Sequence, residues 1–116
     1  MATDKKREWL CILPDKANVL ERRKEVKSQH YEAVKPLVAS GKLVAGGAMF
    51  EKHPVDGEPA LFKGSVIVYT GDSAEEVHKL ITNDAYARGG VWDLEKAQII
   101  PVITFYALPL PHSQVY

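Results

Sequence analysis

The sequence predicts a single α+β domain whose elements follow the order strand, helix, strand, strand, helix, strand. Two patterns carry this prediction: apolar runs of strand length recur along the chain, and two longer segments between them repeat their apolar residues at helical spacing. Length is the third observation, because 116 residues suffice for one domain with a core but not for two. Together they indicate a ferredoxin-like, split βαβ arrangement with a four-stranded antiparallel sheet.

The first strand and the first helix are expected in the N-terminal part of the chain. Residues 9–13 form a continuous apolar run that ends at a Pro-Asp pair, which is typical of a strand that is apolar on both faces. Asn18 and Glu21 have the spacing of a capping box, so we expect a helix from there to about Ser40, with Gly41 as its stop. The stripe of this helix that faces the sheet should contain Val19, Val26, Val34 and Leu37.

The middle of the chain predicts two strands separated by a loop. Residues 43–50 make a second strand, which Gly46 and Gly47 interrupt. Residues 51–64 have the composition of a mobile loop, and residues 65–70 form a third strand that is again apolar on both sides. The chain therefore returns to the sheet before the second helix begins.

The second helix and the last strand complete the order. Ser73 and Glu76 have the spacing of a capping box that opens the helix. Its inward stripe should contain Ala74, Val77, Leu80 and Ile81. Residues 85–90 should form a connection, and residues 92–104 should supply the fourth strand. Pro101 has no backbone N–H to donate, which places this strand at an edge of the sheet.

The expected sheet has one uncovered face, because two helices can cover only the other. Residues 9–13 and 65–69 nevertheless offer apolar side chains to both faces, as strands buried on both sides do. Monomers avoid exposing a large apolar patch to water, so we predict a homodimer in which a second copy packs on this face by two-fold symmetry. The alternative is a monomer whose C-terminal tail folds over the sheet.

Composition and charge exclude several classes of protein. The chain carries 15 basic and 15 acidic side chains, and this balance argues against a nucleic-acid partner. Cys11 is the only cysteine, which rules out an internal disulfide and favours a reducing, cytoplasmic setting. Prolines in the charge-free C-terminal stretch break any spanning helix, so no membrane partner is expected. We expect a flexible segment at residues 1–7, the domain at residues 8–104, and a proline-rich tail at residues 105–116.

Two residues are candidates for acid–base chemistry. His30 lies four residues after Val26 and four before Val34, on the stripe that faces the sheet. Histidine is suited to exchange protons near neutral pH, and Asp84, just beyond the second helix, could fix its tautomer if the two side chains meet. The alternatives remain open at this point, since a core histidine and a helix-ending aspartate are both common without any catalytic role.

Other side chains are candidates for the walls of a pocket, although each could equally belong to the core. Those expected to bind a substrate are Gly47, Met49, Phe50, Tyr86 and Trp92. The remaining histidines lack metal-ligand spacing, so no metal site is expected, and Cys11 is better explained as a core residue. The basic cluster at residues 22–24 is flanked by glutamates and predicts a solvated surface.

Four segments carry a family resemblance when they are taken in order. They are KSQH at residues 27–30, LVAGGAM at 43–49, FKGSVIV at 62–68, and DAY at 84–86 followed by GGVW at 89–92. From about Glu8 to Val102 the chain therefore resembles the YCII-related (YciI-like) family. The resemblance implies a ferredoxin-like unit that dimerises into an α+β barrel, and a histidine–aspartate pair that falls on His30 and Asp84.

The resemblance also implies a function, that of a small cofactor-free enzyme of the lyase or isomerase type. His30 would act as general acid or base, oriented by Asp84, on a hydrophobic cyclic or aromatic small molecule. The reaction would be proton transfer with elimination, isomerisation or cyclisation. The alternative, from another class, is a non-catalytic dimeric module that binds a small ligand in the same cavity, and in that case replacing His30 would abolish no reaction.

Overall fold

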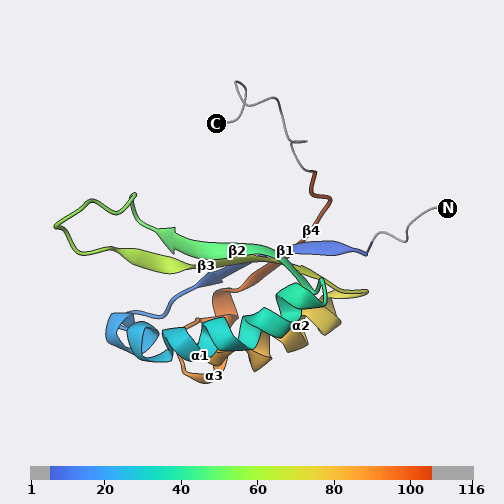
Figure 1. Cartoon of the computed structure of the whole chain (residues 1–116), viewed down its shortest axis with the longest axis horizontal. Helices are drawn as coiled ribbons and strands as arrows, with labels where there is room; N and C mark the ends of the chain where they lie inside the picture. Colours follow the sequence, from blue (N-terminus) through green and yellow to red (C-terminus); the bar gives the residue numbers. More distant parts are fainter. Residues whose placement is uncertain (1–5, 106–116) are drawn as a thin grey trace.

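A four-stranded antiparallel sheet with helices on one face forms the body of the protein in the computed structural model, which describes residues 6–105 (Figure 1). The strands are β1 (Glu8–Pro14), β2 (Leu43–Phe50), β3 (Phe62–Thr70) and β4 (Gln98–Val102), in the spatial order β2-β3-β1-β4. The helices are α1 (Leu20–Ala39), α2 (Ala74–Asn83), the short α3 (Ala85–Arg88) and a single 3₁₀ turn at Leu94–Lys96. The predicted ferredoxin-like α+β fold is confirmed.

The start of α1 differs from the prediction. The residue that caps the helix is Val19, and no side chain makes a capping hydrogen bond there, so the expected capping box of Asn18 and Glu21 is wrong. Asn18 lies before the cap with φ of 60°, in the left-handed region that asparagine tolerates better than most residues. Asparagine thus marks the turn between β1 and α1, and its side chain does not cap the helix.

The β2–β3 pair is longer than expected. β2 continues through Gly46 and Gly47, which pair with Ile67 and Val66 of β3, so the glycines do not interrupt the strand. Strand β3 begins at Phe62, earlier than the predicted Ser65, which shortens the connecting loop. Both glycines stay in register with β3, because pairing depends on the backbone and needs no side chain.

Helix α2 begins where the sequence predicts. The Ser73 hydroxyl accepts a hydrogen bond from the Glu76 N–H at 3.2 Å, as a capping residue should. The Glu76 carboxylate accepts from the N–H of Asp72, also at 3.2 Å, so only the serine half of the expected box forms. Val77 and Ile81 are buried as predicted, whereas Ala74 is exposed.

The segment after α2 contains two features that the sequence did not predict. Residues 85–88 form the short helix α3, where only a connection was expected. Trp92 makes an isolated bridge with Asp15, a 3₁₀ turn follows, and the last strand is confined to 98–102 instead of the expected 92–104. The prediction that Pro101 lies at an edge of the sheet is confirmed, because β4 pairs with β1 alone.

The two faces of the sheet have different environments. Cys11, Leu13, Ile67 and Tyr69 point toward the helices and are buried at 3% exposure or less. Their neighbours along the strands point to the other face, which no element of the described chain covers. The apolar members of that open face are Leu10, Ile12, Val66, Val68, Ile100 and Val102.

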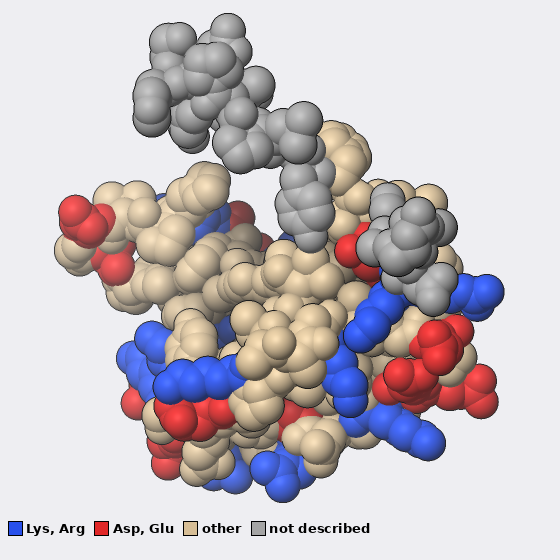
Figure 2. All heavy atoms as spheres, turned by 45° about the vertical axis from the view of Figure 1, so that its right-hand side comes forward, with Lys and Arg blue, Asp and Glu red and all other residues tan. Residues whose placement is uncertain are grey.

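Charge on the surface is mixed. Figure 2 shows Lys and Arg side chains interspersed with Asp and Glu around the helical layer, with mostly uncharged side chains at the level of the sheet. This view contains no extended surface of one sign, in agreement with the equal numbers of acidic and basic residues.

Candidate active site

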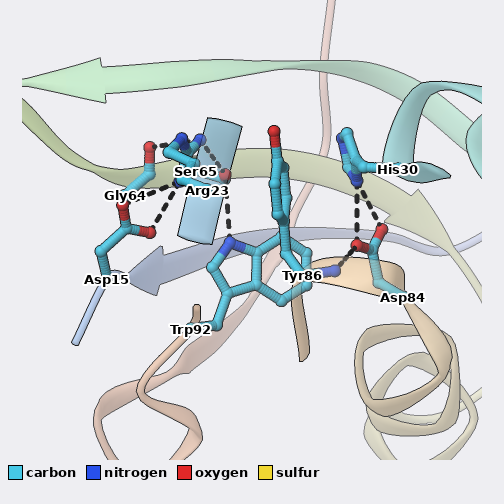
Figure 3. Close-up of polar contacts among 8 residues, drawn as sticks. All are labelled: Asp15, Arg23, His30, Gly64, Ser65, Asp84, Tyr86 and Trp92. Carbon is cyan, nitrogen blue, oxygen red and sulfur yellow. Dashed lines mark hydrogen bonds and ion pairs between the residues drawn. The ribbon is translucent and has the colours of Figure 1, made fainter. Parts of the chain in front are cut away.

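His30 lies on the inner side of α1, and its imidazole meets the carboxylate that follows α2. Its Nδ1 is 2.9 Å from both Oδ1 and Oδ2 of Asp84 (Figure 3). The side chains are 13% and 2% exposed, so the pair is largely withdrawn from water. The two residues that the sequence singled out, 54 positions apart, are therefore in direct contact.

Asp84 is positioned by the junction of α2 and α3. It closes α2 and at the same time caps α3, where its Oδ1 accepts the N–H of Tyr86 at 2.8 Å. The sequence had placed this carboxylate only at the C-terminal end of a helix, where the helix dipole disfavours negative charge. The unpredicted α3 changes that environment, because a backbone donor at its first turn now faces the carboxylate.

The contact with Asp84 sets the tautomer of the imidazole. A carboxylate only accepts hydrogen bonds, so Nδ1 carries the proton and Nε2 carries the lone pair. Nε2 of His30 makes no hydrogen bond to any other residue in the described part of the chain. The imidazole therefore presents an unused proton acceptor while Asp84 holds its orientation.

Tyr86 separates this pair from a second polar group. Its ring stacks on the imidazole of His30 with centroids 4.2 Å apart and planes 24° from parallel. The guanidinium of Arg23 lies 4.6 Å from the centroid of the same ring, and in Figure 3 the tyrosine stands between Arg23 and His30. Burial raises the pKa of Tyr86, while the nearby Arg23 acts in the opposite direction.

Arg23 corrects the prediction that residues 22–24 are a solvated cluster. It is only 5% exposed, and its Nη1 donates to both carboxylate oxygens of Asp15 at 2.7 and 2.9 Å. Its Nη2 donates to the Gly64 carbonyl at 3.3 Å and to the Ser65 hydroxyl at 2.9 Å. Burial raises the pKa of Asp15 even though the Arg23 guanidinium beside it favours the carboxylate. An arginine buried this deeply is retained only with such partners.

These groups border a cavity of about 320 Å³ between α1 and the β2–β3 pair. Most of its wall is apolar and comes from Val34, Val38, Leu43, Val44, Ala45 and Ile67. Its polar wall comes from Arg23, His30, Tyr31, Ser65 and Tyr86. Its volume is at the small end of the range for ligand pockets, which is roughly 300–1,000 Å³.

The five residues expected to bind a substrate fall in four places. Gly47 and Tyr86 line the cavity beside His30, and Phe50 lines a neighbouring hollow that also contains Tyr86. Met49 pairs with Gly64 on the open face of the sheet, because alternation along β2 turns it away from the helices. Trp92 is 1% exposed and its Nε1 donates to Ser65 Oγ at 3.1 Å, so it supports the site from behind without lining the cavity.

Sequence reasoning missed Arg23 and Ser65, and one signal for the first was available. Arg23 falls four residues after Val19 and three before Val26, so it belongs to the same stripe as His30. The charge of an arginine suggested a solvated side chain, whereas the position of Arg23 in the helical repeat indicated a buried one. The position was the better guide. Ser65 gave no comparable signal, because a small polar residue within a strand is common on either face.

Other candidates remain outside the site. Cys11 is buried, and burial raises its pKa to about 12, so it is a core thiol as expected. Over residues 6–105 no three His, Cys, Asp or Glu side chains come together as a group that could hold a metal ion. No helix in that same range is long and apolar enough to cross a membrane.

Comparison with known proteins gives a family and several relatives. Residues 8–102 match the model of the YCII-related domain. The aspercryptin biosynthesis cluster protein B of Emericella nidulans is 38% identical over 99 residues, which are 84% of this chain but only 64% of that protein. Fusaric acid biosynthesis protein 2 of Gibberella fujikuroi is 34% identical over 101 residues, covering 87% of this chain and 96% of its own. A benzaldehyde-derivative biosynthesis cluster protein C of Emericella nidulans is 40% identical over 84 residues, 72% of this chain and 86% of its own.

Among solved structures, a similar chain is 5-chloro-2-hydroxyhydroquinone dehydrochlorinase from Burkholderia phenoliruptrix AC1100, in complex with 2,5-dihydroxybenzoquinone. The TM-score is 0.66 at 21% identity, and the alignment covers 86% of this chain and 95% of that one. At this level of identity the likeness concerns the fold.

Proposed function

The chain belongs to the YCII-related domain family, and from this premise we propose that it is a small enzyme of proton transfer. His30 is the general base or acid, Asp84 orients it, and the substrate is a hydrophobic cyclic or aromatic molecule. The reaction class is elimination, isomerisation or cyclisation, which a positioned acid–base group can serve without further chemistry from the protein.

One observation carries the proposal: the imidazole of His30, held by a buried carboxylate through Nδ1, is part of the wall of a cavity. The 2.9 Å contacts of Nδ1 with both Asp84 oxygens fix the ring, and the 320 Å³ cavity leaves room for a guest beside His30. This is the arrangement of a base, its orienting group and an adjoining space that acid–base catalysis requires.

The nature of the cavity and of the relatives supports the choice of substrate. A mainly apolar wall favours a ring over a sugar or a phosphate. The relatives are named for secondary-metabolite biosynthesis clusters, and the structural neighbour was solved with a quinone bound. Abstraction of a proton from such a ring is a step that a single histidine can accelerate by roughly 10²–10⁴-fold.

The proposal can be tested with a probe that needs only a positioned base and a cavity of aromatic size. We expect the protein to accelerate the base-induced ring opening of 5-nitrobenzisoxazole, which is followed by the absorbance of the product. His30→Ala should lower the rate by roughly 10²-fold or more, and Asp84→Asn should lower it less, because the base remains but loses its orientation.

An exposed histidine provides the matched control. His78 lies on the solvent side of α2, so His78→Ala should leave the rate unchanged. If His30→Ala reacts as fast as the unaltered protein, the acid–base proposal is wrong. Binding of the probe that depends on His30 without any turnover would instead support the non-catalytic ligand-binding module.

We also propose that the protein is a homodimer that buries the open face of the sheet. The apolar residues of β1 and β3 on that face, such as Leu10 and Val68, are directly opposite one another. The helices of the described chain lie on the other face of the sheet (Figure 1). A self-complementary apolar sheet face is suited to a two-fold contact. The dimer would leave His30 and the cavity on the helical side of each sheet.

A further inference from the structure

Ser65 lines the cavity with a hydroxyl whose acceptor positions are occupied and whose proton is unused. Its Oγ accepts one hydrogen bond from Arg23 Nη2 at 2.9 Å and another from Trp92 Nε1 at 3.1 Å. Arginine and tryptophan side chains have no acceptor, so the serine proton can be given to neither of them. The Ser65 hydroxyl makes no further hydrogen bond within residues 6–105, and the residue is only 4% exposed.

An acceptor for this proton can therefore come only from a molecule in the cavity. A buried donor without an acceptor is unfavourable, and native structures rarely leave one unexplained. Because Ser65 is part of the cavity wall, an acceptor atom on a bound molecule would satisfy it. The cavity thus selects for a ligand with an oxygen at this position.

The surroundings of Ser65 favour a negatively charged oxygen over a neutral one. Arg23, with its guanidinium against the hydroxyl, draws electron density from Oγ and strengthens the O–H as a donor. Asp15 balances the charge of Arg23 from the other side at 2.7 Å, so the guanidinium stays fixed in place. Hydrogen bonds in which one partner is ionised are about twice as strong as neutral ones.

Ser65 and His30 lie on opposite sides of Tyr86. In Figure 3 the tyrosine ring stands between the Arg23–Ser65 pair and the imidazole, and all four residues line the same cavity. A ring-shaped molecule that bridges the tyrosine would reach the free Nε2 of His30 at one end and the Ser65 hydroxyl at the other.

We propose that Ser65 is an oxyanion donor and that the substrates of this site are ring compounds in which a carbonyl oxygen is conjugated with the acidic O–H or C–H. His30 Nε2 takes a proton from a ring O–H or C–H at one end of the molecule. The electron pair of the broken bond is delocalised through the conjugated ring onto a carbonyl oxygen at the other end, which becomes the oxyanion. The oxyanion accepts the Ser65 proton in a hydrogen bond, and no oxidant or reductant is required. The proton transfer rests on the proposed function of His30, whereas the donor role of Ser65 does not.

The donor role can be measured without catalysis, using 4-nitrophenol as the probe. Absorbance distinguishes its phenol and phenolate forms, so one titration gives the affinity for each. We expect the phenolate to bind at least about tenfold more tightly than the phenol, a preference that one charge-assisted hydrogen bond can supply. Ser65→Ala should remove this preference and leave the affinity for the neutral phenol nearly unchanged.

A second variant separates the lost proton from a disturbed structure. Trp92→Phe removes the Trp92–Ser65 hydrogen bond but keeps the serine hydroxyl, so it should retain the preference for phenolate. Thermal unfolding of each variant establishes that it is folded. Three results would each overturn the inference. The unaltered protein could bind phenol and phenolate equally well, Ser65→Ala could keep the preference for phenolate, or Trp92→Phe could lose that preference to the same extent as Ser65→Ala.

The same titration in His30→Ala distinguishes this inference from the proposed function. A preference for phenolate that persists in His30→Ala and disappears in Ser65→Ala supports the donor whatever the role of the histidine. If instead ring opening of 5-nitrobenzisoxazole depends on His30 while Ser65→Ala binds phenolate normally, the acid–base function stands and the oxyanion donor is wrong.

Discussion

At the scale of single residues, neighbours decide what each polar side chain can do. Arg23 and His30 occupy the same stripe of α1, yet Arg23 is neutralised by Asp15 and held against Ser65, while His30 keeps a free nitrogen. The difference arises from the partners that the neighbouring segments supply. Asp15, just after β1, and the start of β3 satisfy the arginine, whereas the junction after α2 contacts only one nitrogen of the imidazole.

Cys11 allows a pH-dependent prediction at this scale. Its thiol ionises near pH 9 when the chain is unfolded, and burial raises its pKa to about 12 in the folded protein. The folded state therefore holds a proton that the unfolded state loses in this window. The stability that the neutral thiol contributes is complete below about pH 9 and is lost as the pH rises toward 12.

Urea unfolding of the unaltered protein and of Cys11→Ala from pH 8 to pH 11 measures this effect. The variant lacks the thiol, so above pH 9 its free energy of unfolding should fall less steeply, by up to about 1.4 kcal/mol per pH unit. Loss of the side-chain volume lowers the whole curve of the variant but does not change its slope. Parallel curves over this range would contradict the prediction.

At the scale of elements, short and irregular pieces position the site. The short helix α3 turns Asp84 into a capping residue and brings Tyr86 between His30 and Arg23. The start of β3 supplies the Gly64 carbonyl and the Ser65 hydroxyl, both of which accept from Arg23. Regular pairing of the sheet fixes these two groups, because they belong to consecutive residues of one paired strand.

The glycines of the β2–β3 pair give a contrasting pair of variants. A methyl group at Gly64 would collide with the Leu13 carbonyl and come within 2.8 Å of the Pro14 Cα, so the backbone of β1 or β3 must shift. We expect Gly64→Ala to lower the free energy of unfolding by about 1–3 kcal/mol. The same methyl group at Gly47 meets nothing within 4 Å, and Gly47→Ala should change stability by less than about 0.5 kcal/mol.

Denaturant unfolding of the two glycine variants under the same conditions checks the contrast. Because the Gly64 carbonyl also accepts from Arg23, Gly64→Ala should in addition weaken binding of 4-nitrophenol in the cavity. Equal stability of the two variants would show that β1 lies farther from Gly64 than the structure has it.

At the scale of the whole molecule, the open face of the sheet is the one large apolar surface that no other element of the described chain covers. The helices cover one side of the sheet, and the apolar residues of the other side have only solvent next to them within the described chain. A second copy on this face would bury side chains that a monomer leaves accessible.

A charge placed at the centre of the open face should break the proposed dimer. Val68 pairs with Leu10 of β1 and Ala45 of β2, so Val68→Asp introduces a carboxylate among apolar neighbours of both copies. We expect sedimentation velocity to give a dimer for the unaltered protein and a monomer for this variant. The matched control is Val55→Asp, in the loop between β2 and β3, which should remain dimeric. A monomeric unaltered protein would contradict the proposal.

Much of the architecture was predictable because it depends on local pattern. Apolar runs gave the strands, Ser73 gave the start of α2, and Pro101 gave the edge position of β4. The predicted capping box at Asn18 failed because an asparagine can satisfy a left-handed turn as well as a helix end. Helix α3 was missed because four residues are too few to show a period.

The candidate site likewise has one part that the sequence could predict and one part that it could not. Helical spacing placed His30 toward the sheet, and the family resemblance paired it with Asp84, which the 2.9 Å contacts agree with. Neither could show that Arg23 is buried or that Ser65 accepts two hydrogen bonds, since the partners come from three different elements. The placement of Met49 and Trp92 likewise depended on the register of β2 and on the packing beneath Tyr86.

The sequence by itself determined the order of the elements, the apolar faces and the identity of the histidine–aspartate pair. The first two follow from the periodicity of side chains along one segment, and the pair follows from the resemblance to the family. The tertiary structure alone decided which polar groups are satisfied and which keep an unused donor or acceptor beside the cavity. That outcome depends on distances between residues far apart in the chain, and such distances exist only once the helices lie on the sheet.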